Sequence, residues 1–168
     1  MTNEFARGID WTPKWDPGAP MPQVFSNGHK IFLIYLINEP DQNWDWTYTN
    51  LIDNSSEMIY PLALAEFNGH TFRFGIANDE VFDGLPLWNK GLEYYEAHII
   101  ENSTWITEIK NINKVHPDFN EESWNHKKHF MLLFHDEILE VIATEFKIET
   151  SKTTFGKLAS EVARRMNK

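Results

Sequence analysis

Two unbroken apolar runs and one loosely alternating segment indicate that β-strands form the core of this chain. The apolar runs cover residues 31–37 and 130–134, and runs of this length are typical of strands that are covered on both faces. The second run is followed by a polar break at 135–137 and then by residues 138–148, where apolar and polar side chains alternate loosely. This pattern predicts an antiparallel hairpin over residues 129–148. We expect the hairpin to be central in the sheet, with one face of its second strand in water.

Three other segments, residues 58–66, 71–76 and 94–100, are also predicted to be strands. An Asn-Gly pair at 68–69 separates the first two, and Asn-Gly is a strong signal for a two-residue hairpin turn. Pro61 cannot donate a ladder hydrogen bond, so the strand that contains it is expected at a sheet edge or at a bulge.

Helical spacing of apolar residues occurs in two places. Asn102 or Ser103 can cap a helix that has Trp105, Ile109 and Ile112 on one face. The C-terminal segment from residue 155 onwards is amphipathic with 3.6-residue spacing. Basic residues in its last turn suit the negative end of the helix dipole, so they need no ligand to explain them.

The first 30 residues are rich in tryptophan, proline and glycine. Four prolines between residues 13 and 22 exclude a regular helix and disfavour a paired central strand. Because Trp11 and Trp15 are costly to leave in water, we expect residues 1–30 to form an extended arm that packs on the sheet. The alternative is a proline-aromatic peptide that docks on a partner.

Together these elements predict an α+β fold in one globular domain that covers residues 1–168. The expected architecture is a largely antiparallel sheet of about six strands with two main helices. The proline-rich N-terminal arm, residues 1–30, would wrap the sheet.

The composition narrows the class of protein. A chain of 168 residues is ordinarily one domain with a sizeable core, and 14% aromatic content favours packing over disorder. It contains no cysteine, which excludes disulfides and thiolate chemistry. No apolar run approaches the roughly 18 residues of a membrane span, and the N-terminus lacks the apolar segment of a signal peptide. We therefore expect a cytoplasmic protein that makes no membrane contact.

The net charge of −10 is unevenly distributed along the chain. Residues 1–147 carry 23 acidic and 10 basic side chains, whereas residues 148–168 carry 2 acidic and 5 basic ones. Because contacts to phosphates need clustered lysine and arginine, the acidic body argues against a nucleic-acid partner. It favours a cationic partner or serves solubility, which is the more common role of such a charge.

No phosphate-loop, dinucleotide-binding or serine-nucleophile motif is present, so candidate chemistry lies in separate polar groups. Asn78, Asp79 and Glu80 directly follow a predicted strand. Adjacent carboxylates there can bind a metal or share a proton, and they can equally cap a turn, which is the more common role. His135 and Asp136 lie at the predicted hairpin tip, where a histidine oriented by a carboxylate is a general-base arrangement and a turn also favours Asp.

Glu140 completes this candidate site, because a carboxylate inside an apolar strand needs a partner. The six residues from 78–80, 135–136 and 140 would form a site only if the two turns met at one end of the sheet. We expect the turns to lie apart, each bonded to its own backbone, and we keep their convergence as the alternative. If they meet, a histidine that faces two carboxylates has its pKa raised.

Metal binding has little support in the sequence. His126 and His129 have a spacing that fits metal ligands on one helical turn, but two lysines between them favour a solvated turn. We expect no cofactor and no tightly held metal.

Five segments of the chain contain a set of short motifs: FGIANDE (74–80), GLPLWNKGLEYY (84–95), ENSTWI (101–106), INKVHP (112–117) and HFMLLFHDEILEVIA (129–143). Taken together, they resemble a family of small uncharacterised bacterial proteins. That family's pattern runs G-x-P-N-D-E, H-P-L, G-L-x-x-Y, N-S-x-W, N-x-x-H-P and H-(Y/F)-x-x-x-F-H-D-x-x-x-E. Ala77 stands here where the pattern has proline, and Leu85 where it has histidine. The resemblance covers roughly residues 17–148 and implies one bacterial cytosolic domain, with no activity to carry over.

Three classes of function follow from these observations. The first is a protein- or peptide-binding or regulatory module with an acidic, aromatic-rich surface. The second is a structural or oligomer-forming domain without a ligand. The third is a small hydrolase-like enzyme that uses a carboxylate and histidine cluster. Convergence of the polar groups in one concave pocket would separate the third class from the others.

Overall fold

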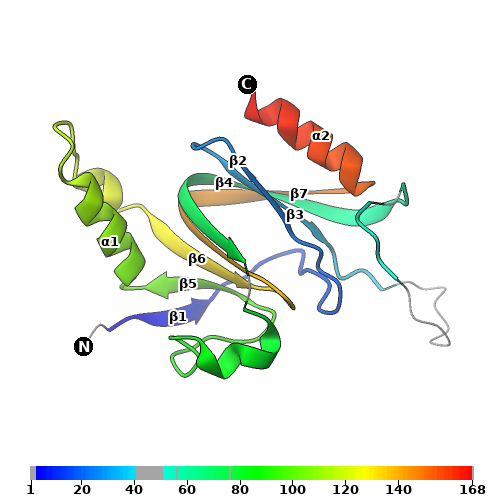
Figure 1. Cartoon of the computed structure of the whole chain (residues 1–168), viewed down its shortest axis with the longest axis horizontal. Coiled ribbons are helices and arrows are strands. Elements are labelled where there is room, and N and C mark those ends of the chain that lie inside the picture. Colours follow the sequence, from blue (N-terminus) through cyan, green and yellow to red (C-terminus); the bar gives the residue numbers. More distant parts are fainter. Residues whose placement is uncertain (1–2, 41–50, 56, 76, 168) are drawn as a thin grey trace.

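A computed structural model describes residues 3–40, 51–55, 57–75 and 77–167 of the chain. Within these residues, seven strands form one sheet in the order β1-β5-β6-β7-β4-β3-β2, and every neighbouring pair is antiparallel (Figure 1). The predicted α+β class and the two main helices are confirmed. The elements are β1 (Phe5–Gly8), β2 (Gln23–Ser26), β3 (Ile31–Leu36), β4 (Tyr60–Gly75), η1 (Asp79–Gly84), β5 (Ala97–Glu101), α1 (Thr104–Asn113), η2 (Glu122–Trp124), β6 (Lys128–Leu133), β7 (Ile138–Thr153) and α2 (Phe155–Met166).

The predicted hairpin at 129–148 is the pair β6–β7, and it lies at the centre of the sheet. A tight turn joins the two strands, in which the Phe134 backbone N–H donates to the Glu137 carbonyl at 2.9 Å. Apolar side chains of β6 are almost fully buried, with Leu132 0% and Leu133 4% exposed. Consecutive residues of β6 are buried because other parts of the chain cover both faces of the strand, as its unbroken apolar run predicted.

The strands β4 and β7 are each 16 residues long and pair along their whole length. The register shifts twice between Phe67 and Thr71, so β4 contains a bulge there and curves (Figure 1). Beyond the bulge β4 no longer pairs with β3, while β7 gains β6 as its second neighbour. The sheet therefore consists of two halves that share the long β4–β7 pair.

The predicted hairpin turn at 68–69 is wrong, because the chain continues through these residues as the one strand β4. A two-residue turn of the common type needs positive φ angles at both residues, and Asn68 and Gly69 do not have them. Instead, the absence of a side chain at Gly69 allows Ile31 of β3 to approach β4 closely. A Cβ atom added at Gly69 would lie 2.5 Å from Cδ1 of Ile31, so any larger residue would force the buried Ile31 side chain to shift.

The strand that contains Pro61 was predicted to lie at a sheet edge or to bear a bulge; β4 lies between β7 and β3, so it is not an edge strand, and the second alternative holds. A bulge does occur in this strand, but at residues 67–71 rather than at the proline. Pro61 is the second residue of β4, and its carbonyl accepts a hydrogen bond from the Ile37 N–H at 3.0 Å. Proline has no backbone N–H to donate to the ladder of hydrogen bonds between strands, and it is tolerated at the start of a strand.

The N-terminal arm packs on the sheet as predicted and also contributes strands to it. The side chains of Trp11 and Trp15 are only 2% and 3% exposed. β1 and β2 lie at the two opposite edges of the sheet, which is where proline-rich segments can pair. These two additional strands, together with the fusion of two predicted strands into β4, give seven strands rather than about six.

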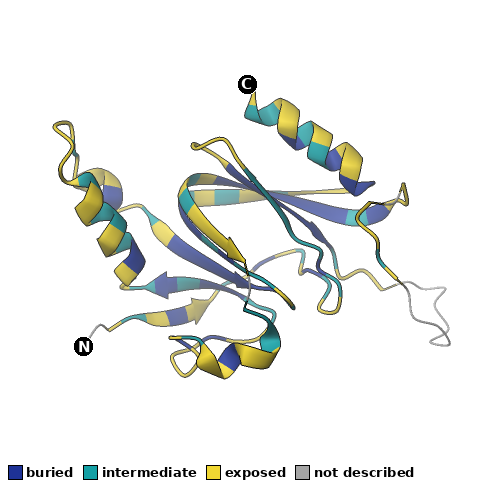
Figure 2. Ribbon diagram, in the orientation of Figure 1, coloured by how far each residue is buried: buried dark blue, intermediate teal, exposed yellow. Residues whose placement is uncertain are grey.

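Three apolar clusters cover the two faces of the sheet. The arm packs on one face, where Trp11 stacks on Phe146 at 4.6 Å between ring centroids. On the other face α2 covers β3 and β4, with Phe155 and Val162 buried (Figure 2). The third cluster lies under the segment that contains η1, next to β5 and β6. Between α1 and this segment the second face is left open, and the candidate site lies there.

Of the two predicted caps of α1, Asn102 and Ser103, the structure has Ser103, whose Oγ accepts a hydrogen bond from the Ile106 N–H at 3.1 Å. Trp105 faces the sheet and is buried, whereas Ile112 is 60% exposed and lies outside the packed face. No helix among the described residues has the length and apolar character that a membrane crossing would require.

Candidate functional site

A cavity of about 430 Å³ lies on the open part of the second sheet face. Its floor consists of β4, β7 and β6, and its sides are α1 and residues 85–87. Its wall is mixed, with charged groups from three parts of the chain and an apolar remainder. The lining residues are Glu4, Arg73, Phe74, Gly75, Ala77, Leu85, Pro86, Leu87, Thr104, Trp105, His129, Met131, Ile138 and Glu140.

Strand register explains why the charged groups of the floor share one face. Arg73 of β4 and Met131 of β6 both lie directly opposite Glu140 of β7. Directly opposed residues point to the same side of a sheet, so these three side chains form one row across the strands. His129 is two residues before Met131 and therefore lies on the same face, diagonal to Glu140.

A series of hydrogen bonds holds the Glu140 carboxylate at the cavity wall. Glu140 Oε2 lies 2.9 Å from His129 Nε2, and His129 Nδ1 lies 2.9 Å from Ser103 Oγ. His129 and Ser103 are buried, with 4% and 6% exposure, while the Glu140 side chain is 23% exposed. In the neutral imidazole, the Ser103 hydroxyl donates to Nδ1 and the Nε2–H donates to the carboxylate.

This series contains the residue types of a nucleophilic triad, but Ser103 is not placed as a nucleophile. Its Oγ already accepts the Ile106 N–H as the cap of α1, and it does not line the cavity. A nucleophilic oxygen must face the substrate. Ser103 is therefore a positioning residue that fixes the ring of His129, and through it the carboxylate of Glu140.

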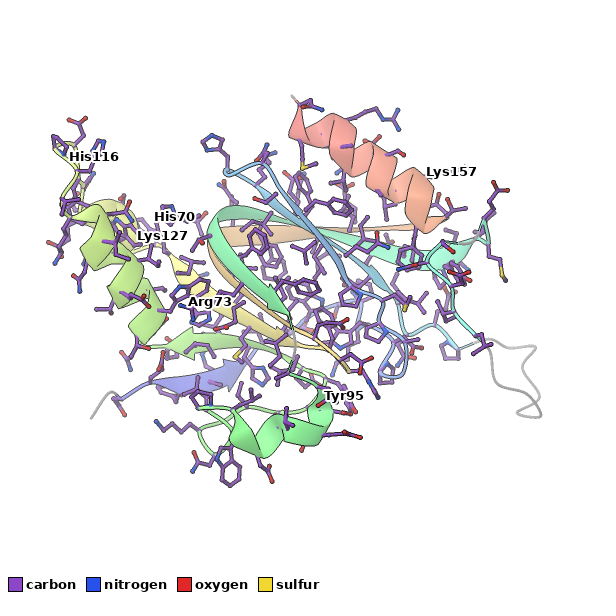
Figure 3. The ribbon with its side chains drawn as sticks, in the orientation of Figure 1. His70, Arg73, Tyr95, His116, Lys127 and Lys157 are labelled. Atoms are coloured by element: carbon purple, nitrogen blue, oxygen red, sulfur yellow. The ribbon has the colours of Figure 1, made fainter. Side chains whose placement is uncertain are left out.

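The α1 side of the cavity is also held by specific contacts. The guanidinium carbon of Arg73 lies 4.2 Å from the ring centroid of Trp105, and Arg73 Nη2 lies 3.6 Å from Glu108 Oε2. Figure 3 shows Arg73 on the α1 side of β4. Glu4 Oε1 accepts the backbone N–H of Thr104 at 2.7 Å, which ties the arm to the first turn of α1.

The two turns of the sequence-predicted site meet, contrary to the expected separation. The Asp79 backbone N–H donates to the His135 carbonyl at 3.0 Å, and Asp79 Oδ2 lies 3.7 Å from His135 Nε2. Asp136 Oδ1 lies 3.0 Å from His135 Nδ1. Tyr95, whose φ of 57° is in the left-handed region, donates its hydroxyl to Asp79 and stacks on the His135 ring. The turns converge because β7 and β4 are neighbours, so both chain reversals lie at one end of the sheet.

The other predicted site residues lie outside this contact. Glu80 is exposed, Asn78 is half-buried, and Glu140 belongs to the large cavity instead. The hollow beside the two turns has a volume of only about 10 Å³. That volume is at the lower limit for one water molecule, so the two turns do not form a ligand pocket. Their contact, made by Asp79 and His135 and called the His135 latch below, holds two chain reversals together.

The histidine pair at 126 and 129 does not share a helical turn. His126 is exposed in the turn that precedes β6, whereas His129 is buried within β6. Within the described part of the chain, no three histidine, cysteine, aspartate or glutamate side chains are grouped closely enough to hold a metal ion.

Sequence reasoning identified Glu140 but missed its surroundings. The apolar strand around Glu140 indicated that a partner was needed, and that partner is His129, 11 residues earlier. The hairpin register would have placed the two on one face, once the turn at 134–137 was known. No sequence signal pointed to Arg73 or Trp105, because their approach depends on how α1 packs on the sheet.

The His135 latch gives a prediction about pH. The hydrogen bond to Asp136 and the nearby charges of Asp79 and Glu137 raise the pKa of His135 above 6.5. A raised pKa means that protonation stabilises the fold, fully below about pH 6.5, and that this contribution is lost as pH rises through the folded-state pKa. The free energy of unfolding that His135→Ala removes should therefore be larger near pH 5.5 than near pH 8. Because the ring is 40% exposed, water will keep the difference small.

Denaturant melts at the two pH values measure this difference, with NMR titration of the His135 ring as a second readout. Asp136→Asn should bring the pKa of His135 closer to 6.5, while Glu145→Gln, an exposed change elsewhere on β7, should leave it alone. Equal losses at both pH values would show that the latch does not depend on the charge of His135.

The fold and the cavity define an α+β protein with a mixed polar and apolar cavity on one face of an antiparallel sheet. Comparisons with protein-family models, with curated proteins and with solved structures found no match to this chain.

Proposed function

We propose that this protein is a peptide- or protein-binding module that takes part of its partner into the cavity between α1 and the strands β4, β7 and β6. The observation that carries this proposal is the series Ser103–His129–Glu140, which holds a carboxylate at the wall of a concave site. Binding sites are typically apolar cavities with a few polar groups held in fixed positions, and a volume of about 430 Å³ lies within their usual range.

The charges of the cavity and of the whole chain support a partner with positive groups. Glu4 and Glu140 supply two carboxylates to the wall, against one guanidinium from Arg73. The net charge of −10 would attract such a partner over longer distances and increase the rate of association.

The competing interpretation is that the hydrogen-bonded series only attaches α1 to the sheet. His129 also makes an edge-to-face contact with Trp105, 5.0 Å between ring centroids, which would serve that purpose. The two interpretations predict different effects of removing the Glu140 charge on partner binding. A purely structural role needs the hydrogen bond to His129 but not the charge.

We therefore predict that Glu140→Gln abolishes partner binding while the thermal melt stays within about 2–4 °C of the parent protein. Glutamine has the same shape, and its amide oxygen can still accept from His129 Nε2. The measurement is affinity capture from a lysate of the source organism, followed by quantification of each captured protein. The matched control is Glu145→Gln, which makes the same chemical change at an exposed position of the same strand.

A partner that is captured by the parent and the control, and lost with Glu140→Gln, supports the cavity as the binding site. Undiminished capture by Glu140→Gln would contradict it. A large loss of stability in Glu140→Gln would instead identify the carboxylate as a structural group.

A further inference from the structure

We infer that the cavity recognises the free amino terminus of a peptide, with the terminal ammonium group on Glu140 and the first side chain on the apolar wall. This inference rests on the proposed function, because it specifies which part of a peptide partner enters the cavity. It is based on Arg73 and Glu140, which carry opposite charges on the cavity floor but do not pair with each other.

Arg73 and Glu140 lie directly opposite each other on β4 and β7. Opposite charges in such positions ordinarily pair with each other. Here each is engaged elsewhere: Arg73 lies over the Trp105 ring near Glu108, and Glu140 accepts from His129. The ion pairs found among the described residues do not join Arg73 to Glu140. The cavity floor thus presents a cation and an anion side by side, each oriented by a different neighbour.

The orientation of Glu140 leaves it suited to a cationic ligand. His129 contacts only one of its two carboxylate oxygens, Oε2. A partly buried carboxylate is stabilised by a cation that donates hydrogen bonds to it, and the second oxygen of Glu140 is left for such a donor. Glu4 supplies a second carboxylate to the cavity lining, where it also accepts hydrogen bonds from Thr104.

A peptide amino terminus matches this arrangement in three respects. Its ammonium group has three donors for the carboxylates of Glu140 and Glu4. Its first carbonyl oxygen is an acceptor close to the ammonium group and can meet the guanidinium of Arg73. Its first side chain can pack on the apolar part of the lining, which includes Leu85, Leu87, Met131 and Ile138.

Two other ligand groups match less well. A lysine side chain carries an ammonium group but has no acceptor next to it, so the donors of Arg73 would stay unmatched. A peptide carboxyl terminus could meet Arg73, but it would be repelled by Glu4 and Glu140. An amino-terminal amine capture site is the arrangement in which all three charged groups have a complementary partner.

The test compares the tripeptide amide Leu-Gly-Gly-NH₂ with its N-acetylated form. Binding is followed through the indole N–H signal of Trp105 in NMR spectra, assigned with Trp105→Phe, because this ring lines the cavity. The free peptide should perturb the signal at a pH of about 6.5, where an α-amino group of pKa about 7.7–8.0 is protonated. Acetylation should weaken binding by about 10- to 100-fold, the usual value of a charged hydrogen-bonded contact.

Three further observations are expected if the inference is correct. Raising the pH to about 9 should weaken binding of the free peptide, because the amine loses its proton. Glu140→Gln should weaken binding about as much as acetylation does. Glu145→Gln should leave it unchanged.

Other outcomes would overturn the inference in distinguishable ways. Equal binding of the acetylated peptide would leave a peptide-binding cavity that ignores the amino terminus, so the proposed function would stand alone. Tighter binding of acetyl-Lys-Gly-Gly-NH₂ would assign the site to a cationic side chain. If neither peptide perturbs Trp105, the inference is wrong, and the capture experiment with Glu140→Gln then decides the proposed function separately.

Discussion

Replacement of Trp11 by alanine is expected to lower the free energy of unfolding by about 3–5 kcal/mol, the usual cost of removing a large buried aromatic side chain. Trp11 is 2% exposed, stacks on Phe146, and donates its indole N–H to the Tyr35 hydroxyl at 3.0 Å. The substitution would remove these contacts and leave a cavity between the arm and the sheet. The measurement is a denaturant melt at constant pH.

Trp88→Ala is the matched control, because Trp88 is 45% exposed and should cost far less. A loss below about 1 kcal/mol for Trp11→Ala would show that the arm is only loosely attached. That result would revive the alternative in which the proline-aromatic segment is a docking peptide.

Replacement of Leu132 by alanine is expected to cost about 2–5 kcal/mol of stability. Leu132 is fully buried in β6, opposite Leu139 on one side and Ala97 on the other. The rest of the core surrounds this position closely, so little relaxation can fill the space that is lost.

Leu51→Ala makes the same substitution at a side chain that is 83% exposed and should change stability by no more than about 0.5 kcal/mol. If the two substitutions had similar small effects in denaturant melts, the β6–β7 hairpin could not be the centre of the fold.

The fold was predictable from the sequence where local pattern and burial agree. The apolar run before residue 135 predicted a central, doubly covered strand, and β6 is one. A helix cap was predicted at Asn102 or Ser103 from residue type and position, and Ser103 caps α1. In both cases short-range chemistry and tertiary packing favour the same structure.

The errors arose where one residue type serves two structural purposes. The Asn-Gly pair at 68–69 has the composition of a hairpin turn, yet Gly69 is used for its lack of a Cβ atom beside Ile31. β1 and β2 were missed because residues 1–30 were interpreted as one extended proline-rich arm, although edge positions allow parts of such an arm to pair.

The sequence by itself determined the class of fold, the central hairpin, the packing of the arm and the need of Glu140 for a partner, because these depend on local pattern and on the cost of burying or exposing particular side chains. Only the tertiary structure decided that the turns at 78–80 and 135–136 meet and that Glu140 lies elsewhere, on a cavity wall with Arg73. Those placements depend on strand order, on the bulge in β4 and on the docking of α1. All three are set by contacts between residues far apart in the chain, which no local pattern records.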